Sequence, residues 1–256
     1  MLQLNGSNKI LKKTFMPNAI IVGCATGMGK ASAIRLAGKG YRLGLADYQV
    51  DLLDAYAKEL PADVFTCKIN VAHHIEAREQ LGVLIERIGG VDLFIYCVGI
   101  RHDKTQSWES ENELYQVNAI GFAALTHFIF NYFRDNKLMG HIVGLTSILA
   151  MRGVDFATPY CASKFFMRGY LQGLRHQSAA QKLGISITEI RPGFVRTPMT
   201  NNQRNLFWVS SVEKAAVQIM QAIDRKKKWA YVTKRWELVG LLFKFTPTAM
   251  MNLLKI

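Results

Sequence analysis

The sequence predicts an α/β protein in which a parallel sheet is flanked by helices. Short apolar runs alternate with amphipathic segments along the chain, which is the pattern of strands and helices in such a sheet. A glycine-rich turn joins the first apolar run to the first amphipathic segment. The chain has 256 residues and is 50% hydrophobic, so it can bury a large core within one domain.

We expect residues 18–233 to form this domain, after a polar and basic leader at residues 1–17. Residues 234–256 are expected to be an apolar and basic extension of the same domain. The predicted strands are residues 19–22, 42–46, 64–69, 91–97, 142–147, 185–190 and 230–232. Helical spacing of apolar residues predicts helices through residues 33–37, 73–88, 111–134, 158–182 and 212–224.

The formal net charge of +13 is concentrated near the two ends of the chain, and we expect it to form a solvated basic surface. The basic run at residues 226–228 is short and no nucleic-acid module is visible, so no nucleic-acid partner is expected. The four cysteines have neither C-x-x-C spacing nor accompanying histidine pairs, so we expect no metal, no disulfide framework and a cytoplasmic protein. No apolar run reaches the roughly 20 residues that span a bilayer.

The turn after the first predicted strand carries Gly23, Gly27 and Gly29. Glycines at a strand-to-helix turn let backbone amides approach a pyrophosphate, and the helix N-terminus favours its negative charge. A tight turn without a ligand is the alternative. The position between the first strand and the first helix favours a dinucleotide site.

The second predicted strand is followed by Asp47, 18 residues beyond Gly29. This is near the distance at which an acidic residue meets the adenosine ribose of a dinucleotide. A carboxylate there repels a 2′-phosphate and favours NAD over NADP, although Lys30 lies close enough in sequence to offset that repulsion. The alternative role of Asp47 is to cap the helix that begins near Gln49.

Tyr160 and Lys164 are four residues apart in a segment with helical spacing, so both side chains leave one face of one helix. The pKa of a phenol is about 10, and moving it about three units toward neutrality takes roughly 4 kcal/mol. An ammonium at ~4 Å and an effective dielectric of ~20 supplies about 4 kcal/mol, which predicts that Lys164 lowers the pKa of Tyr160 enough for acid–base catalysis. Ser147 would then hydrogen-bond the reacting oxygen. The alternative is a helix with a surface lysine and a half-buried tyrosine.

Asn118 lies inside the predicted helix at residues 111–134, where an asparagine costs helix propensity. One interpretation is a bend or a water site close to Lys164. The other is a buried polar residue that is satisfied locally.

These motifs occur in one order over residues 18–232: the glycine turn, Val117-Asn118, Ser147, Tyr160-x-x-x-Lys164 and Pro192-Gly193-x-Val195-x-Thr197. In this respect the chain resembles the short-chain dehydrogenase/reductase family. The resemblance implies a Rossmann-like, doubly wound parallel sheet of about seven strands with helices on both faces and a short C-terminal helical extension. It also implies hydride transfer between a nicotinamide and a carbonyl or carbinol carbon.

The resemblance implies a role for each candidate catalytic residue. Tyr160 would donate or accept the proton, and Ser147 would orient the substrate oxygen. Lys164 would hold the nicotinamide ribose and lower the pKa of Tyr160, while Asn118 would position a water that links Lys164 to solvent. Thr197 would contact the cofactor carboxamide.

The expected cofactor is NAD, with NADP as the other option. Besides Tyr160 and Lys164, the expected cofactor contacts are Gly23, Ala25, Thr26, Gly27, Met28, Gly29, Asp47, Asn70, Val71, Cys97, Gly99, Pro192, Gly193, Val195 and Thr197. Three positions depart from the family's usual residues: Val22 replaces a common Thr, Asn70 a common Asp, and Cys97 the Asn of Asn-Ala-Gly. The changes at Val22 and Cys97 remove hydrogen bonds near the glycine turn, which would weaken cofactor binding by about 1 kcal/mol each.

The substrate is expected to be an apolar or extended carbonyl or alcohol compound. In this fold it is read by residues 100–112, 149–159 and 194–211. These segments carry large apolar side chains, namely Trp108, Met151, Phe156, Met199, Phe207 and Trp208. The second functional class is a catalytically idle dinucleotide-binding protein that acts in regulation or at a membrane surface, but the intact Ser147, Tyr160 and Lys164 favour the enzyme.

Two further surfaces carry predictions. The helices at residues 111–134 and 158–182 are apolar over more than one stripe, which predicts a homodimer or homotetramer. The C-terminal extension alternates aromatic and cationic residues. One expectation is a helix that folds back over the substrate mouth or over a dimer partner. The other is a peripheral contact with a membrane, and both expectations can be true together.

Overall fold

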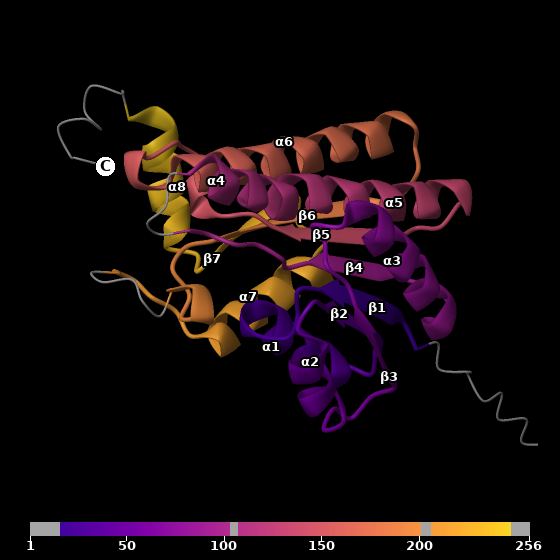
Figure 1. Ribbon diagram of the computed structural model, residues 1–256. Helices are drawn as coiled ribbons and strands as arrows, with labels where there is room; N and C mark the ends of the chain where they lie inside the picture. Colours follow the sequence, from indigo (N-terminus) through magenta and orange to yellow (C-terminus); the bar gives the residue numbers. More distant parts are fainter. Residues whose placement is uncertain (1–15, 103–106, 201–205, 247–256) are drawn as a thin grey trace, which may run out of the picture.

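The computed structural model of the protein describes residues 16–102, 107–200 and 206–246. Seven parallel strands form one sheet in the order β3-β2-β1-β4-β5-β6-β7, with helices on both faces (Figure 1). The predicted doubly wound sheet of seven strands is therefore confirmed. The strand order reverses between β1 and β4, which leaves a crevice at the carboxyl ends of these two strands.

All seven predicted strands are present, and their bounds shift by one or two residues at most. They are β1 Asn18–Val22, β2 Arg42–Asp47, β3 Val64–Lys68, β4 Leu93–Tyr96, β5 His141–Leu145, β6 Ser186–Pro192 and β7 Trp229–Val232. Every residue of β4 and β5 is buried, because both faces of these central strands are covered. The apolar run that predicts β4 begins at Val91 and continues to Cys97, beyond the paired residues at both ends.

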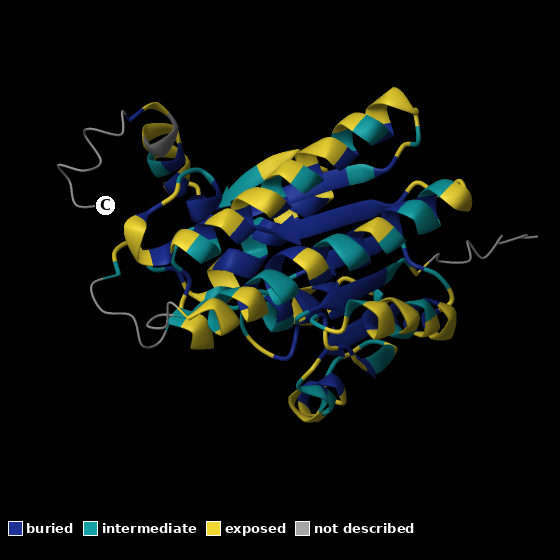
Figure 2. Cartoon of the chain, turned by 45° about the horizontal axis from the view of Figure 1, so that its top comes forward, coloured by how far each residue is buried: buried dark blue, intermediate teal, exposed yellow. Residues whose placement is uncertain are grey.

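Helices cover the sheet in two layers. One layer contains α1 Gly27–Ala37, α2 Val50–Ala57 and α7 Val212–Asp224, and the other contains α3 His74–Ile88, α4 Trp108–Tyr115, α5 Phe122–Asp135 and α6 Thr158–Ala180. Alternate strand positions enter two cores: Ile20 and Phe94 pack under the second layer, and Ile21 and Ile95 under the first. The sheet is mostly buried and the outer helix faces are exposed (Figure 2).

The predicted helix at residues 111–134 is present, but its middle is not α-helical. A π-helical turn, Gln116–Gly121, joins α4 to α5 and contains Asn118. A π turn carries one extra residue per turn and is frequent at functional sites. The low helix propensity of Asn118 therefore coincides with a local change from α-helix to π-helix.

The prediction that α5 has an apolar stripe beyond what the core needs is wrong. Phe122, Phe130 and Phe133 are all buried in the core. They are needed there because α5 packs against the sheet and against α3 and α6, so more than one stripe of this helix is covered. On α6, by contrast, Phe165 and Phe166 are exposed.

The C-terminal extension lies against the domain as far as it is described. Helix α8, Trp236–Phe245, contacts β7 and the 3-10 turn Ile148–Ala150, and its Trp236 is 2% exposed (Figure 1). Residues 1–15 of the predicted leader and residues 247–256 of the predicted extension lie outside the described residues. None of the helices in the described part of the chain has both the length and the apolar character needed to cross a bilayer.

Candidate active site

The predicted motif residues come together at the carboxyl edge of the sheet. The glycine turn follows β1, residues 97–99 follow β4, Ser147 follows β5 and residues 193–197 follow β6. These four strands are parallel and adjacent in the order β1-β4-β5-β6, so their carboxyl ends lie side by side. Lys164 reaches the same edge from α6, where its Nζ atom donates a hydrogen bond to the carbonyl of Leu145 at 3.4 Å.

Tyr160 and Lys164 share one face of α6, as their spacing predicts. The Lys164 Nζ atom lies 5.6 Å from the centroid of the Tyr160 ring. The guanidinium of Arg101 lies 5.9 Å from the same centroid. The Tyr160 ring therefore has two cations from different segments nearby, and it is only partly buried.

The pKa of Tyr160 is raised rather than lowered. Burial is the largest effect and raises this pKa, whereas the hydrogen bond with the Ser147 hydroxyl and the charge of Arg101 lower it by less. The prediction that Lys164 brings the phenol toward neutrality is therefore wrong for this structure. The physical reason is that burial desolvates the phenolate, and this outweighs the attraction of nearby positive charge.

Lys164 is itself perturbed, because it is only 3% exposed. Burial lowers the pKa of Lys164 to about 8, and the neighbouring Cys97 opposes this weakly. The ammonium form still predominates at neutral pH. A Cβ atom at Gly99 would lie 3.0 Å from Nζ, so the glycine keeps the space beside the ammonium open.

Asn118 is fully buried, and both atoms of its side-chain amide form hydrogen bonds. Its Oδ1 atom accepts from the Ile100 amide at 2.8 Å, and its Nδ2 atom donates to the Ile100 carbonyl at 2.8 Å and to Ser163 Oγ at 3.1 Å. These bonds support the interpretation of a locally satisfied polar residue. They also fix the segment after β4 to α6 close to Lys164, while the water-positioning role stays a prediction.

Ser147 lies directly beyond β5 and caps the following 3-10 turn. Its Oγ atom accepts a hydrogen bond from the Leu149 amide at 3.1 Å. The Ser147 hydroxyl also interacts with Tyr160 and lowers its pKa. The 3-10 turn thus holds the Ser147 hydroxyl beside the candidate acid–base residue.

The glycine turn has the geometry that a phosphate requires. Gly23 and Gly27 have positive φ angles of 85° and 58°, and a Cβ atom at Gly29 would lie 2.1 Å from the Gly23 carbonyl oxygen. The N-cap residue of α1, Thr26, makes no side-chain capping bond, and the first turn of α1 contains no acidic residue. The residues present therefore fit the pyrophosphate of a dinucleotide at this helix N-terminus.

Asp47 contacts both the glycine turn and the start of α2. Its carboxylate accepts hydrogen bonds from the Ala25 amide at 2.9 Å and from the Gln49 amide at 3.1 Å. Gln49 is the N-cap residue of α2, whose first-turn amides receive no side-chain capping bond, so the helix-cap interpretation of Asp47 is not supported. The bond to Ala25 holds the carboxylate beside the glycine turn. The nearby Lys30 ammonium lies 4.5 Å from the centroid of the Tyr56 ring.

The family substitutions at Asn70, Val22 and Cys97 lie in the same region. Asn70 is exposed after β3, and its Oδ1 atom accepts a hydrogen bond from the Ala72 amide at 3.1 Å; the adjacent Val71 is buried. The Cys97 amide donates to the Val22 carbonyl at 2.8 Å. The backbone thus still joins β4 to β1 where neither side chain supplies a hydrogen bond.

The segment after β6 lies against the glycine turn. Pro192 ends β6, and Val195 is buried and pairs with Ser210 in an isolated parallel bridge. A Cβ atom at Gly27 would lie 3.4 Å from Thr197 Cγ2. Thr197 is therefore close to the turn, where the resemblance places a cofactor contact.

Sequence reasoning missed Arg101 and the contact made by Trp236. The position of Arg101 directly beyond Gly99 and Ile100, at the carboxyl edge, is the signal that identifies it. A Cβ atom at Gly193 would lie 2.1 Å from the Trp236 ring, so α8 packs on the backbone of the segment after β6. No local pattern indicates this contact, because it joins segments far apart in the sequence.

Aromatic rings gather near the site. Phe194, Phe207, Trp208 and Trp236 make ring contacts with centroid distances of 5.1–5.9 Å. Tyr160 and Met151 pack against the small buried cluster that contains Trp236. Of the other apolar residues predicted to read the substrate, Trp108, Phe156 and Met199 are exposed. Phe207 and Trp208 are exposed as well, so the predicted residues differ in their ring contacts rather than in their burial.

Within residues 16–102, 107–200 and 206–246, no group of three or more His, Cys, Asp or Glu side chains is arranged to hold a metal ion.

Comparison with known proteins identifies the family. The family model described as short chain dehydrogenase matches residues 17–206. An uncharacterized oxidoreductase of Staphylococcus haemolyticus is 31% identical over 195 residues, which cover 71% of this chain and 79% of the relative. The fold is similar to a short-chain dehydrogenase from Sphingobium yanoikuyae in complex with NADPH, with a TM-score of 0.77 and 20% identity over 91% of this chain and 98% of that chain. It is also similar to one from Burkholderia phymatum in complex with NAD, with a TM-score of 0.81 and 18% identity over 89% of this chain and 92% of that chain.

The chain therefore belongs to the short-chain dehydrogenase/reductase family, as its motifs predict. It is an oxidoreductase of that family with a Rossmann-like fold.

Proposed function

We propose that the protein is an NAD-dependent oxidoreductase that interconverts an alcohol and a carbonyl group on an apolar or extended substrate. The observation that carries this proposal is the placement of Ser147, Tyr160 and Lys164 at the sheet edge where the glycine turn also lies. A protein that only binds a dinucleotide has no need of a phenol, a hydroxyl and a buried ammonium in one cluster.

The side chains divide the proton chemistry among them. When bound, the nicotinamide supplies or takes up the hydride. The Tyr160 hydroxyl gives its proton to the substrate oxygen during reduction and recovers it during oxidation, and the Ser147 hydroxyl donates a hydrogen bond to the same oxygen. Lys164 stabilises the phenolate that forms when Tyr160 loses its proton, an effect that grows as the site excludes water.

The aromatic cluster supports the proposed substrate class. Phe207 and Trp208 contact the ring of Trp236, and Tyr160 packs against the same buried cluster. A ligand that reaches Tyr160 thus meets several aromatic rings on this side, which suits an apolar chain or ring system.

The test is a panel of ketones, aldehydes and alcohols of increasing apolar length, with sugars as the polar comparison. NADH formation or consumption is followed by absorbance, and kcat/KM is expected to rise with apolar size. Failure of every compound to exceed the rate of the Tyr160→Phe variant would overturn the proposal. Turnover of sugars alone would overturn the substrate class.

A catalytically idle dinucleotide-binding protein is the second candidate. It is favoured by one observation, that Val22 and Cys97 supply only backbone hydrogen bonds beside the glycine turn. The same assay separates the two candidates, because an idle member binds NADH in calorimetry without turning over any compound in the panel.

We predict that the protein binds NADH more tightly than NADPH because the Asp47 carboxylate is held beside the glycine turn. Asp47→Asn removes the charge and keeps an acceptor for Ala25, so the preference should fall by about tenfold, the equivalent of 1.4 kcal/mol of charge repulsion. Titration of both cofactors measures it. The matched control is Asp51→Asn, which removes an exposed carboxylate in the first turn of α2. Tighter binding of NADPH by the unmodified protein would contradict the prediction.

A homodimer or homotetramer through α6 is part of the proposal. The exposed Phe165 and Phe166 lie on this helix, and Phe166 stacks on Tyr170 with centroids 5.9 Å apart. Phe166→Glu is expected to shift the mass in light scattering toward the monomer at micromolar concentration, because it places a charge in a covered apolar surface. Leu52→Glu, at an equally exposed position on α2, should leave the mass unchanged. A monomeric unmodified protein would contradict the prediction.

A reducing, cytoplasmic compartment also belongs to the proposal. All four cysteines are free thiols, and three of them are buried. Burial raises the pKa of the Cys97 thiol to about 12, with Asp47 adding to the effect and Lys164 opposing it. Such a thiol is unreactive at neutral pH, in keeping with a protein that carries no disulfide.

A further inference from the structure

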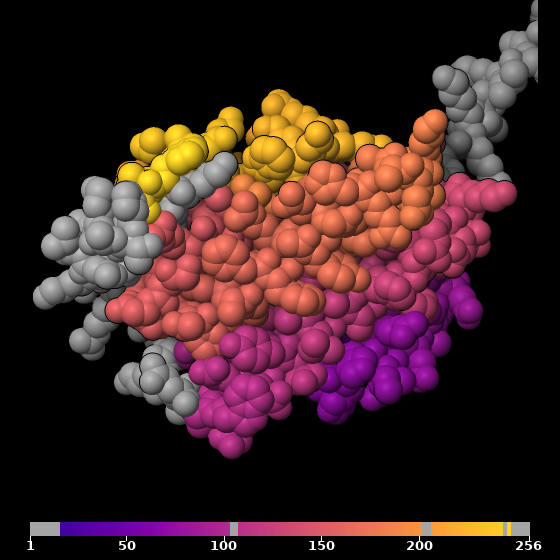
Figure 3. All heavy atoms as spheres, turned by 90° about the horizontal axis from the view of Figure 1, so that it is seen from above, coloured from indigo at the N-terminus to yellow at the C-terminus, as the bar shows by residue number. Residues whose placement is uncertain are grey.

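A groove of about 1010 Å³ lies between α6 and α8, beside the edge strand β7. Ser147, Tyr160 and Lys164 do not line it. The elements α6 and α8 lie on the same face of the molecule, where their atoms are orange and yellow in Figure 3. This surface is therefore separate from the proposed catalytic cluster.

Basic side chains dominate the groove. Its basic lining residues are Arg168, Arg175, Arg191, Lys228, Lys234 and Arg235. The acidic lining residue is Glu237, at the exposed rim. Behind the lining, Glu189 is fully buried and already forms an ion pair with Arg191, with Nη2 and Oε2 2.6 Å apart. The groove therefore has an excess of positive charge that the described residues do not neutralise.

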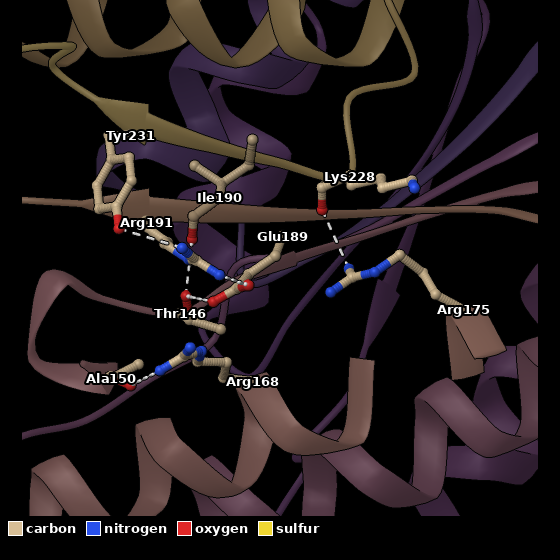
Figure 4. A network of polar contacts seen from close by, with 9 residues as sticks. All are labelled: Thr146, Ala150, Arg168, Arg175, Glu189, Ile190, Arg191, Lys228 and Tyr231. Carbon is tan, nitrogen blue, oxygen red and sulfur yellow. Dashed lines mark hydrogen bonds and ion pairs between the residues drawn. The ribbon is translucent and has the colours of Figure 1, made fainter. Parts of the chain in front are cut away.

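The floor of the groove contains an unsatisfied buried donor. The Arg191 side chain is 8% exposed, and its Nη1 atom donates to the Tyr231 hydroxyl at 3.1 Å (Figure 4). Its Nε atom is buried and has no hydrogen-bond partner among the described residues. Arg168 and Arg175 extend from α6 toward the same strand, and each donates to a backbone carbonyl, of Ala150 and Lys228 respectively. The guanidinium groups are thus fixed in place by the protein before any ligand binds.

The α8 wall adds an apolar surface to this charge. Leu238, Leu241, Leu242 and Phe245 follow one another at helical spacing and are 54–68% exposed. Trp236 and Gly240, on the opposite face of the helix, are buried against the domain. Leu238 and Leu241 also line the groove. The exposed face of α8 is therefore apolar directly beside the basic groove.

We propose that the α6–α8 surface docks the protein onto an anionic phospholipid membrane, with headgroup phosphates at the basic groove and the exposed face of α8 against the acyl boundary. Apolar helix faces flanked by cations bind at this depth of a bilayer. A soluble phosphate would leave the apolar face of α8 unused. A second copy of the chain in a two-fold contact would set this basic groove against itself.

The test is sedimentation of the full-length protein with vesicles, without substrate, so that its result does not depend on the proposed enzymatic activity. One set of vesicles contains equal parts phosphatidylcholine and phosphatidylglycerol, and the other contains phosphatidylcholine alone. At about 0.01 M salt, where the Debye length is about 30 Å, the protein should sediment with the anionic vesicles only. Absence of binding to the anionic vesicles would overturn the proposal.

Two double variants and one control locate the contact. Lys228→Gln/Lys234→Gln removes two exposed charges of the groove and should weaken partitioning about thirtyfold, since each basic residue near an anionic surface contributes about fivefold. Lys58→Gln/Lys68→Gln removes two exposed charges elsewhere and should leave partitioning nearly unchanged. Leu238→Ser/Leu241→Ser should weaken binding by about tenfold or more through the lost apolar area.

The remaining outcomes decide against the proposal. Equal losses in the two lysine pairs would show a general charge effect rather than a docking surface. Thermal stabilisation by inorganic phosphate that Lys228→Gln/Lys234→Gln abolishes, without vesicle binding, would assign the groove to a soluble anion instead. Light scattering of a vesicle-free sample that changes in Leu238→Ser/Leu241→Ser, again without vesicle binding, would assign the surface to a second copy.

Discussion

Replacing Tyr160 with phenylalanine is expected to lower kcat roughly a thousandfold, because a positioned acid–base group contributes about 10²–10⁴-fold. The variant keeps the aromatic ring and its contacts with Lys164 and Arg101, whose charged groups lie 5.6 Å and 5.9 Å from the ring centroid. It loses only the hydroxyl that Ser147 bonds. Cofactor affinity, measured by calorimetry, should therefore stay nearly unchanged.

Lys164→Met gives the contrasting signature. The methionine fills most of the buried volume but removes the ammonium that faces the open space at Gly99. Both kcat and cofactor affinity should fall, because the proposed roles of Lys164 include cofactor binding and phenolate stabilisation. Cys161→Ala, a buried change one residue from Tyr160, serves as the packing control and should leave both nearly unchanged.

These variants can contradict the assignments separately. Turnover that survives in Tyr160→Phe would remove the acid–base role of the phenol. A loss of kcat in Lys164→Met without weaker cofactor binding would remove the ribose contact and leave only the electrostatic role. A similar loss in Cys161→Ala would show that the site responds to packing rather than to the missing groups.

The fold could be predicted from the sequence because the central strands of the sheet are covered by helices on both faces. Such strands read as short apolar runs, of which Ile20, Ile21 and Val22 in β1 are an example. The order of the motifs then indicates which strand ends carry Ser147 and the glycine turn. The parallel arrangement brings those ends together without any further information.

The electrostatics of the site are less accessible from the sequence. The spacing of Tyr160 and Lys164 predicts a shared helix face, but the pKa of Tyr160 depends on how completely the fold desolvates it. Arg101 influences the same phenol from a different element. Burial and through-space distance are properties of the assembled chain, so a spacing argument gave the wrong direction for the pKa.

Packing between distant segments is also hidden from a local pattern. The phenylalanines of α5 suggest a spare apolar stripe, yet Phe130 and Phe133 are needed by the core. The close contact between Trp236 and Gly193 depends on where α8 returns to the domain. Periodicity predicts that a helix has an apolar face, but it does not say how many neighbours that helix will have.

The buried ion pair under the basic groove gives the largest expected effect on stability. Glu189 on β6 is fully buried, and its carboxylate accepts a hydrogen bond from Thr146 at 3.0 Å and pairs with Arg191 at 2.6 Å (Figure 4). Burial lowers the pKa of the Arg191 guanidinium, but its bonds to Glu189 and Tyr231 outweigh this and raise it overall. Each ion is thus stable in the interior only because the other is present.

Arg191→Met is therefore expected to lower the free energy of unfolding by about 3–5 kcal/mol, because it leaves the Glu189 carboxylate buried without its cation. The melting temperature should fall by about 10 °C for a chain of this size. Lys39→Met breaks an ion pair of the same 2.6 Å length between Lys39 and Asp224, whose side chains are 40% and 53% exposed, and should cost less than about 1 kcal/mol. The double variant Glu189→Gln/Arg191→Met should be more stable than Arg191→Met alone, since it buries no unpaired charge. Denaturant titration measures all three, and an Arg191→Met variant no less stable than Lys39→Met would show that the interior does not depend on this pair.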